Sequence, residues 1–149
     1  MVDSVNTGYK YDAVEILFSG SELGVLAAGN FSAASDVINV DYSTYLDLDG
    51  IIKTTSATLS GATWGIYLIP AVRPDVFADW TAGASDSPAN EKWYRGSFTL
   101  KAASGDHIVS ETGIALPAGN YKLGFRNNTA QASLAASKVY RRAWRLGSQ

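Results

Sequence analysis

Four basic residues gather near the C-terminal end of the sequence and are interleaved with Tyr140 and Trp144; they are Lys138, Arg141, Arg142 and Arg145. Cations and aromatic rings mixed in this way could hold a phosphate backbone and stack on bases. The segment also has the alternating pattern of a strand, which would direct Arg141 and Arg142 to opposite faces. We therefore expect no nucleic-acid partner. We expect instead an anchoring strand whose arginines pair with carboxylates of the N-terminal half or of a neighbouring subunit.

Trp80 is the tryptophan best placed to contact a ligand. It lies in residues 75–90, a stretch with Pro, Gly, Ser and Asp that predicts a long excursion between strands. An exposed indole ring there could stack on a sugar. Trp80 could equally act as a plug that attaches the excursion to the rest of the domain. The sequence is compatible with both roles.

Catalytic chemistry has little support in the sequence. His107 is the single histidine, so a Ser-His-Asp triad would have to use it. It follows Ser104, Gly105 and Asp106, which predicts an exposed turn leading into a strand. Residues 83–87 lack the last glycine of a nucleophile elbow. No spacing selects a pair among the 14 acidic residues, so we expect no catalytic residue and no enzyme.

Metal and cofactor sites are also not expected. Asp47-Leu48-Asp49-Gly50 resembles the middle of a calcium loop, but Tyr45 and Ser56 stand where the loop needs Asp and Glu. The sequence has no cysteine and no glycine-rich phosphate loop. The favoured interpretation of these acids is solvated carboxylates on a strand edge. An irregular calcium site built from loop carboxylates is the alternative.

The elements that must position these residues are mainly strands, because apolar residues recur with period two. Tyr121, Leu123 and Phe125 alternate with polar or small residues, whereas Thr63–Val72 is apolar on both faces and predicts a covered central strand. Gly96 predicts a bulge and Gly50 a break in the inward pattern. The remaining predicted strands are Ala13–Phe18, Tyr45–Lys53, Trp93–Leu100, Ile108–Ser110, Gly113–Leu116 and Val139–Leu146. We predict an all-β fold, an antiparallel β-sandwich of jelly-roll type with about eight strands.

Length and charge complete the prediction. A chain of 149 residues fits a single domain, which we place at residues 12–149, preceded by a possible N-terminal arm at residues 1–11. Residues 1–52 hold one cation and eight acids, whereas residues 53–149 hold 11 cations and six acids. The net charge of −2 argues against nucleic acid as a partner. No apolar stretch is long enough for a membrane span, so no membrane partner is expected.

Several segments, in order, resemble a known family. They are Val5–Asp12, Trp64–Val72, Tyr94–Phe98, Leu116–Lys122 and Tyr140–Arg142. Together they are similar to small virion structural proteins of tailed bacteriophages. The resemblance implies a capsid decoration or cement protein, a β-sandwich that assembles as a homotrimer in the host cytoplasm. It also implies binding to the major capsid protein on the outside of the head.

The sequence thus favours a non-enzymatic component of a virion. The candidate interface residues are Tyr9, Lys10, Tyr11, Lys138, Arg141, Arg142 and Arg145. The alternative hypothesis is a carbohydrate- or receptor-binding β-sandwich module of a phage tail or fibre, with Trp80 as the stacking residue.

Overall fold

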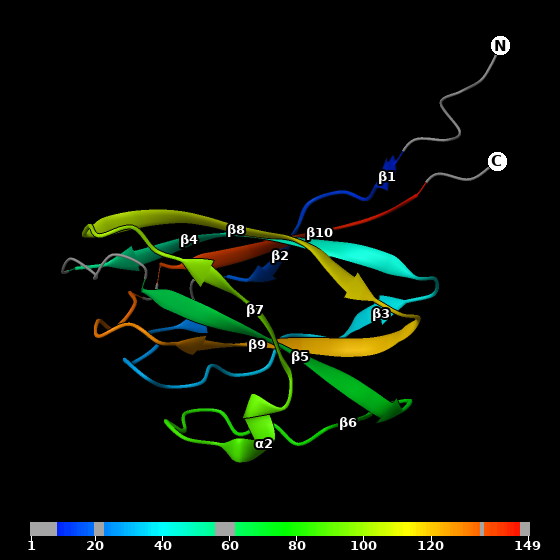
Figure 1. Cartoon of the computed structure of the whole chain (residues 1–149), viewed down its shortest axis with the longest axis horizontal. Helices are drawn as coiled ribbons and strands as arrows, with labels where there is room; N and C mark the ends of the chain where they lie inside the picture. Colours follow the sequence, from blue (N-terminus) through cyan, green and yellow to red (C-terminus); the bar gives the residue numbers. More distant parts are fainter. Residues whose placement is uncertain (1–8, 20–22, 56–61, 135, 147–149) are drawn as a thin grey trace, which may run out of the picture.

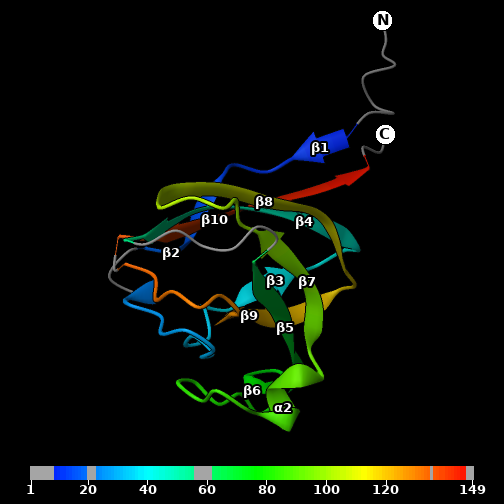
Figure 2. The ribbon, with the colours of Figure 1, turned by 60° about the vertical axis from the view of Figure 1, so that its left-hand side comes forward.

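The computed structural model describes residues 9–19, 23–55, 62–134 and 136–146. The chain forms two antiparallel β-sheets that pack face to face, and Figures 1 and 2 show them as an upper and a lower layer. The predicted all-β sandwich is confirmed. No helix in the described part of the chain has the length and apolar character needed to cross a membrane.

The upper layer, sheet A, is built around β10. Strand β4 pairs with one edge of β10 and carries β8 on its outer side, whereas β1 and β2 share the other edge of β10. The strands of sheet A are β1 (Tyr9–Tyr11), β2 (Glu15–Phe18), β4 (Thr44–Thr54), β8 (Gly105–Leu116) and β10 (Lys138–Leu146).

The lower layer, sheet B, is built around β5 and β9. Strand β9 joins β5 to β3, and the far edge of β5 pairs with β7 along one part and with β6 along another. The strands of sheet B are β3 (Ile38–Val40), β5 (Thr63–Arg73), β6 (Val76–Phe77), β7 (Tyr94–Thr99) and β9 (Gly119–Asn127).

The strand order is that of a jelly roll. Apart from the short strands β1 and β6, sheet A has the order β2-β10-β4-β8 and sheet B the order β3-β9-β5-β7. Successive strands alternate between the sheets except at β5 and β7, which are neighbours in sheet B. This arrangement of eight strands is the double Greek key of jelly-roll proteins, so the predicted topology is confirmed.

The core lies between the sheets and follows the period-two pattern. Leu46, Leu48 and Ile52 of β4 are fully buried against residues of sheet B such as Trp64 and Phe125. Gly50 does not break this pattern as predicted. It occupies the next inward position of β4, where a Cβ atom would lie 3.1 Å from the Val109 side chain, because β8 and β10 approach closely there.

The pairing register shifts in four of the strand pairs, and two of these shifts bear on predictions. At the first, Leu46 pairs with Ile114 and Leu48 with Glu111, so the two predicted strands at 108–110 and 113–116 are one bulged strand, β8. Gly113 takes a positive φ of 71° there, as a bulge glycine can. The bulge predicted at Gly96 is confirmed, since Ile66 pairs with Gly96 and the next residue of β5 pairs with Tyr94.

Among the described residues, three short strands and one helix were not predicted. Strands β3 and β6 have only three and two residues, too few to show a period. Helix α2 (Pro88–Glu91) is a single turn inside the predicted excursion, with Ser87 as its N-cap. Strand β1 lies in the predicted N-terminal arm. Residues 1–8 of that arm are outside the described part of the chain.

Candidate functional site

Most of the candidate interface residues meet at one corner of sheet A, whereas Lys138 lies at the other end of β10, opposite Ile51. Strand β1 pairs with the end of β10, so that Tyr9 lies opposite Leu146, Lys10 opposite Arg145 and Tyr11 opposite Trp144. Figure 1 shows β1 and this end of β10 side by side at the right-hand end of the upper layer. The fold therefore brings together residues separated by most of the sequence.

The outer face of sheet A carries five interacting side chains, which we call the aromatic patch: Tyr11, Tyr45, Asp47, Arg142 and Trp144. The Trp144 ring stacks on Tyr45, with centroids 4.5 Å apart and planes at 21°. The Tyr11 ring lies 6.0 Å from Trp144, and the Arg142 guanidinium lies 4.3 Å from the Tyr11 centroid. The patch is thus a row of rings with their orientation fixed by one another.

Asp47 is the polar centre of the aromatic patch. Its Oδ1 accepts hydrogen bonds from Trp144 Nε1 at 2.8 Å and from the Gly113 amide at 3.0 Å, and its Oδ2 accepts one from Arg142 at 3.2 Å. Burial acts to raise the pKa of this carboxyl, but these hydrogen bonds and the Arg142 charge outweigh it and lower the pKa from 3.8. Asp47 is therefore ionised at neutral pH and holds three groups in place.

The other two arginines of β10 face the opposite way. Arg141 pairs with Glu15 at 2.7 Å, and Arg145 lies 5.6 Å from the Tyr42 centroid. Both line a groove of about 150 Å³ at the end of the sandwich, together with Asp12 and other residues. The predicted division of the basic cluster is confirmed, as is the pairing of Arg141 and Arg142 with carboxylates of the acidic half.

Trp80 packs on the outer face of sheet B. Its indole Nε1 donates to the Ser32 carbonyl at 2.9 Å, and its ring lies 5.3 Å from Phe31 and 5.6 Å from Tyr67. A Cβ atom on Gly124 would overlap the indole, so the ring lies directly on the backbone of β9. One edge of Trp80 also lines an open hollow of about 380 Å³. These contacts give Trp80 the role of a plug.

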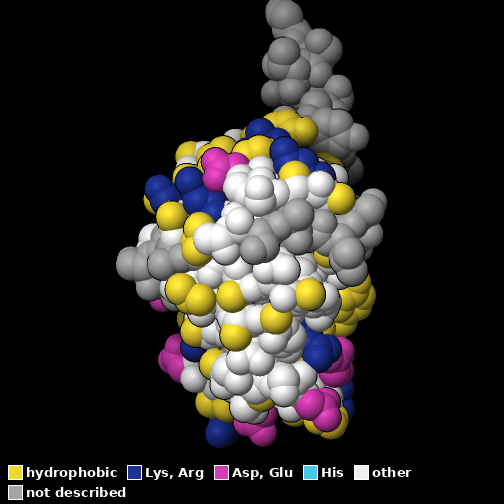
Figure 3. Space-filling view, turned by 90° about the vertical axis from the view of Figure 1, so that its left-hand side faces the viewer, with side chains coloured by type: hydrophobic (Ala, Val, Ile, Leu, Met, Phe, Trp, Pro, Cys, Tyr) yellow, Lys and Arg dark blue, Asp and Glu magenta, His cyan; other side chains and the backbone are white. Residues whose placement is uncertain are grey.

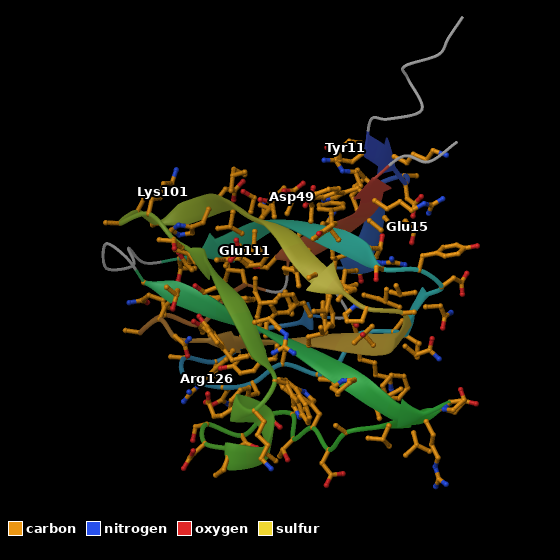
Figure 4. All side chains as sticks on the ribbon, turned by 45° about the vertical axis from the view of Figure 1, so that its right-hand side comes forward. Tyr11, Glu15, Asp49, Lys101, Glu111 and Arg126 are labelled. Carbon is orange, nitrogen blue, oxygen red and sulfur yellow. The ribbon has the colours of Figure 1, made fainter. Side chains whose placement is uncertain are left out.

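An arginine clamp fixes the rest of the excursion. Arg126 of β9 pairs with Glu91 at 2.9 Å and donates to the carbonyls of Ser85 and Gly29. Figure 4 shows Arg126 below sheet B, among the side chains of the excursion. Burial raises the pKa of the nearby Tyr67 hydroxyl, and the negative charge of Glu91 adds to the effect. The outer face of sheet B is therefore covered by the chain itself.

His107 is not the exposed turn residue that the sequence predicted. It lies on the inner face of β8 and is 1% exposed, because β8 begins three residues earlier than expected. Its Nε2 is 3.1 Å from the Thr54 hydroxyl, and its Nδ1 has no hydrogen-bond partner among the described residues. Burial lowers the pKa of the imidazole from 6.5, Lys101 lowers it further, and Asp106 acts in the opposite direction. His107 is a neutral core residue at pH 7.

The acids of the calcium-like segment lie on β4 rather than in a loop. Asp47 has the protein partners described above, and Asp49 is exposed one alternation further along the strand. Over residues 9–19, 23–55, 62–134 and 136–146, no three His, Cys, Asp or Glu side chains come close enough together to hold a metal ion.

Comparison with known proteins gives no family. No family model and no curated protein matches the chain. Among solved structures, it is similar to the C-terminal CBM6 of LamC, a marine laminarinase from Zobellia galactanivorans, with 14% identity over 90% of each chain and a TM-score of 0.40. It is also similar to CsCBM6-3 from Clostridium stercorarium, solved with cellobiose, with 13% identity over 94% of this chain and 89% of that chain and a TM-score of 0.39.

A third similar structure is that of infectious bursal disease virus, Gx strain. The identity is 14%, the TM-score is 0.43, and the match covers 93% of this chain but 34% of the viral one. At these identities the likeness concerns the β-sandwich fold alone, and no residue role is transferred from any of the three.

Three members of the aromatic patch were not among the predicted interface residues: Tyr45, Asp47 and Trp144. The sequence contained a signal for them, since positions 45 and 47 alternate on β4 and positions 142 and 144 alternate on β10. Only the pairing register, Tyr45 opposite Trp144 and Asp47 opposite Arg142, brings the two pairs onto one surface.

Proposed function

We propose that this protein is a non-enzymatic structural component of a bacteriophage virion, a decoration protein that binds the major capsid protein on the outside of the head through the aromatic patch. The observation that supports this proposal is the contrast between the two outer faces. Within the described ranges, no element lies over the outer face of sheet A, and this open face carries the aromatic patch.

The composition of the aromatic patch suits a protein partner. Tyrosine, tryptophan and arginine are enriched among the residues that dominate protein–protein binding. Tyr11 is 53% exposed and Tyr45 is 39% exposed. Because Asp47 and the ring contacts already fix these side chains, little rotamer freedom would be lost on association. The patch is a pre-organised surface.

The same contacts disfavour a sugar as the ligand of this patch. Stacking on a sugar requires a free ring face, and protein contacts already occupy one face of each ring: Trp144 stacks on Tyr45, and Arg142 lies over Tyr11. The indole N–H, which could bind a hydroxyl, donates to Asp47 instead. A protein surface can pack against ring edges and the guanidinium group, so it matches this arrangement better.

One observation favours the second candidate function, a carbohydrate- or receptor-binding module. The open hollow beside Trp80 is also lined by Phe77 and by Lys122, whose ammonium lies 4.6 Å from the Phe77 centroid. Asp79 lines the same hollow. Aromatic rings beside charged groups are suited to a small polar ligand.

Sedimentation of the protein with heads tests the first proposal. Heads of the phage that encodes the chain, stripped of this protein, would be mixed with the wild type, with a Tyr11→Ala/Tyr45→Ala variant and with a Tyr94→Ala control. Tyr94 is 48% exposed and lies on sheet B, so it matches the exposure but not the surface. We expect the double variant to lose at least tenfold in affinity and the control to bind normally.

Immunogold labelling of intact particles locates the protein independently. Gold over the head supports the proposal. Gold confined to the tail contradicts it and favours the receptor-binding module, in which case Trp80→Ala is the next variant to test. Equal head binding by all three proteins would show that the aromatic patch is not the contact.

A further inference from the structure

We infer that the adjoining part of the same outer face, toward Lys138 of β10, binds a second copy of this chain about a two-fold axis. This surface, here called the isoleucine patch, consists of Asp49, Ile51, Ile108, Lys138 and Tyr140. It does not depend on the proposed function, because it involves neither the aromatic patch nor a capsid.

The register of sheet A places these residues in two neighbouring rows. Lys138 of β10 lies opposite Ile51 of β4, which lies opposite Ile108 of β8. In the next row, Tyr140 lies opposite Asp49. Figure 4 shows Asp49 near the middle of the upper side of sheet A, away from sheet B, with Tyr11 toward the right-hand end of the same layer. The two patches thus share one face.

The isoleucine patch contains both a projection and a depression. Ile108 is 75% exposed, the most exposed of the large hydrophobic residues in the described chain. Beside it is an open hollow of about 470 Å³ lined by Ile51, Ile108 and Tyr140 above the backbone of β4 and β8. Exposed apolar area of this kind on a sheet marks an interaction surface. A second copy supplies the projection that fills the depression.

The isoleucine patch also carries two charges that could pair between two copies. Asp49 and Lys138 have opposite charges and lie in adjacent rows of one face. Neither has an ion-pair partner among the described residues. Figure 3, which views one end of the sandwich, shows basic and hydrophobic side chains together along the top, where sheet A lies. The patch is therefore apolar in the middle with one charge of each sign.

A two-fold axis satisfies both features at once. In an isologous contact each surface meets its own copy, so the projection and the depression are used twice. Lys138 of each copy then lies against Asp49 of the other, and both charges gain a partner. An unrelated partner would need this complementarity built separately, whereas a second copy has it already. The homotrimer implied by the family resemblance would have to use other surfaces.

Reversal of the two charges tests the contact directly. Light scattering after size exclusion would measure the mass of the wild type, of Asp49→Lys and of Lys138→Asp, each over a range of concentrations. We expect twice the mass of one chain for the wild type and one chain for either variant, since like charges then face each other. An equal mixture of the variants should recover the double mass, because the introduced lysine of one copy would then face the introduced aspartate of the other across the axis.

A hydrophobic variant with a matched control completes the test. Ile108→Glu should give the mass of one chain, whereas Val72→Glu should keep the double mass. Val72 is similarly exposed, at 69%, but lies on β5 of sheet B. Thermal unfolding of each variant would confirm that it folds.

Three results would overturn the inference. They are a wild-type mass of one chain at every concentration, a trimeric mass unaffected by Ile108→Glu, and a mixture of the charge variants that stays at the mass of one chain. None of these results bears on the proposed function, because no head is present in the assay.

Discussion

The outer faces of the two sheets carry similar residues that serve different purposes. Each has a tryptophan whose indole N–H is bound, Trp80 to the Ser32 carbonyl and Trp144 to Asp47. Each also has an arginine paired with a carboxylate across elements, Arg126 with Glu91 and Arg142 with Asp47. On sheet B these contacts hold the excursion over the sheet, whereas on sheet A they hold side chains upright on an open face.

The difference follows from what each tryptophan contacts. Trp80 comes from a different segment than the sheet it covers and lies flat on Gly124, so it adds a small second core. Trp144 belongs to the sheet and stacks on its cross-strand neighbour Tyr45, so it buries little beyond that pair. A covered face should therefore contribute to stability, and an open face mainly to binding.

The largest expected effect is on the covered face. Trp80→Ala removes the plug and should destabilise the fold by about 3 kcal/mol, the low end for truncating a large aromatic side chain, because the ring is half-buried. Gly124→Ala should cost about 2 kcal/mol, because its methyl group would overlap the indole. Urea unfolding measures both.

The double variant sharpens this prediction. Once Trp80 is absent, Gly124→Ala should cost much less than it does alone, so the two effects should not add. Simple additivity would mean that Trp80 does not lie on Gly124.

On the open face, Asp47→Ala should cost about 2 kcal/mol, because the Trp144 indole and the Gly113 amide lose their acceptor. Since the pKa of Asp47 is lowered in the fold, its contribution is fully present above 3.8 and is lost as pH falls below that value. The indole N–H resonance of Trp144 should shift with a midpoint below 3.8. A midpoint at or above this value would contradict the hydrogen-bond network.

Protonation of His107 should destabilise the whole sandwich, since this residue lies between the two sheets. Its pKa is lowered by burial, so its contribution to stability is fully present above pH 6.5 and decreases as pH falls below 6.5. His107→Gln should flatten the dependence of the melting temperature on pH between 7.5 and 5 (about the range in which histidine titrates). An unchanged slope would assign that dependence to other groups.

The smallest effect on stability is expected from Tyr11→Ala in the aromatic patch. Tyr11 is half-exposed on a three-residue strand, so the free energy of unfolding should change by less than about 1 kcal/mol. If Tyr11→Ala weakens head binding without a comparable loss of stability, Tyr11 serves binding rather than folding. A large loss of stability would instead make Tyr11 a structural residue.

The sequence predicted the strands that alternate clearly, and with them the sandwich. Thr63–Val72 was predicted to be covered on both faces, which holds for Trp64–Ile69 but not for Val72, which is 69% exposed. Trp64, Ile66 and Leu68 face the inter-sheet core, while Tyr67 and Ile69 lie under the excursion. Whether a strand residue points inward or outward depends on local sequence, and the period of two in the apolar residues shows it.

The sequence could not predict what depends on register. His107 was expected in a turn because Ser104, Gly105 and Asp106 are polar, yet β8 begins at Gly105 and its first inward residue is His107. The aromatic patch requires Tyr45 to lie opposite Trp144, a pairing between residues 99 positions apart that no local pattern specifies. The alternating pattern of a single strand therefore predicts which of its residues share a face, but it does not predict which strand pairs with it.

The pairing of β1 with the end of β10 has a mechanical consequence. Because the strands are antiparallel and Tyr9 lies opposite Leu146, a force that separates the two chain ends acts across the ladder rather than along it. The hydrogen bonds would then open one after another from that pair inward, as a zipper does, at low force. Tension applied at Tyr9 and Leu146 would detach β1 from β10 before the longer ladder between β10 and β4 opens.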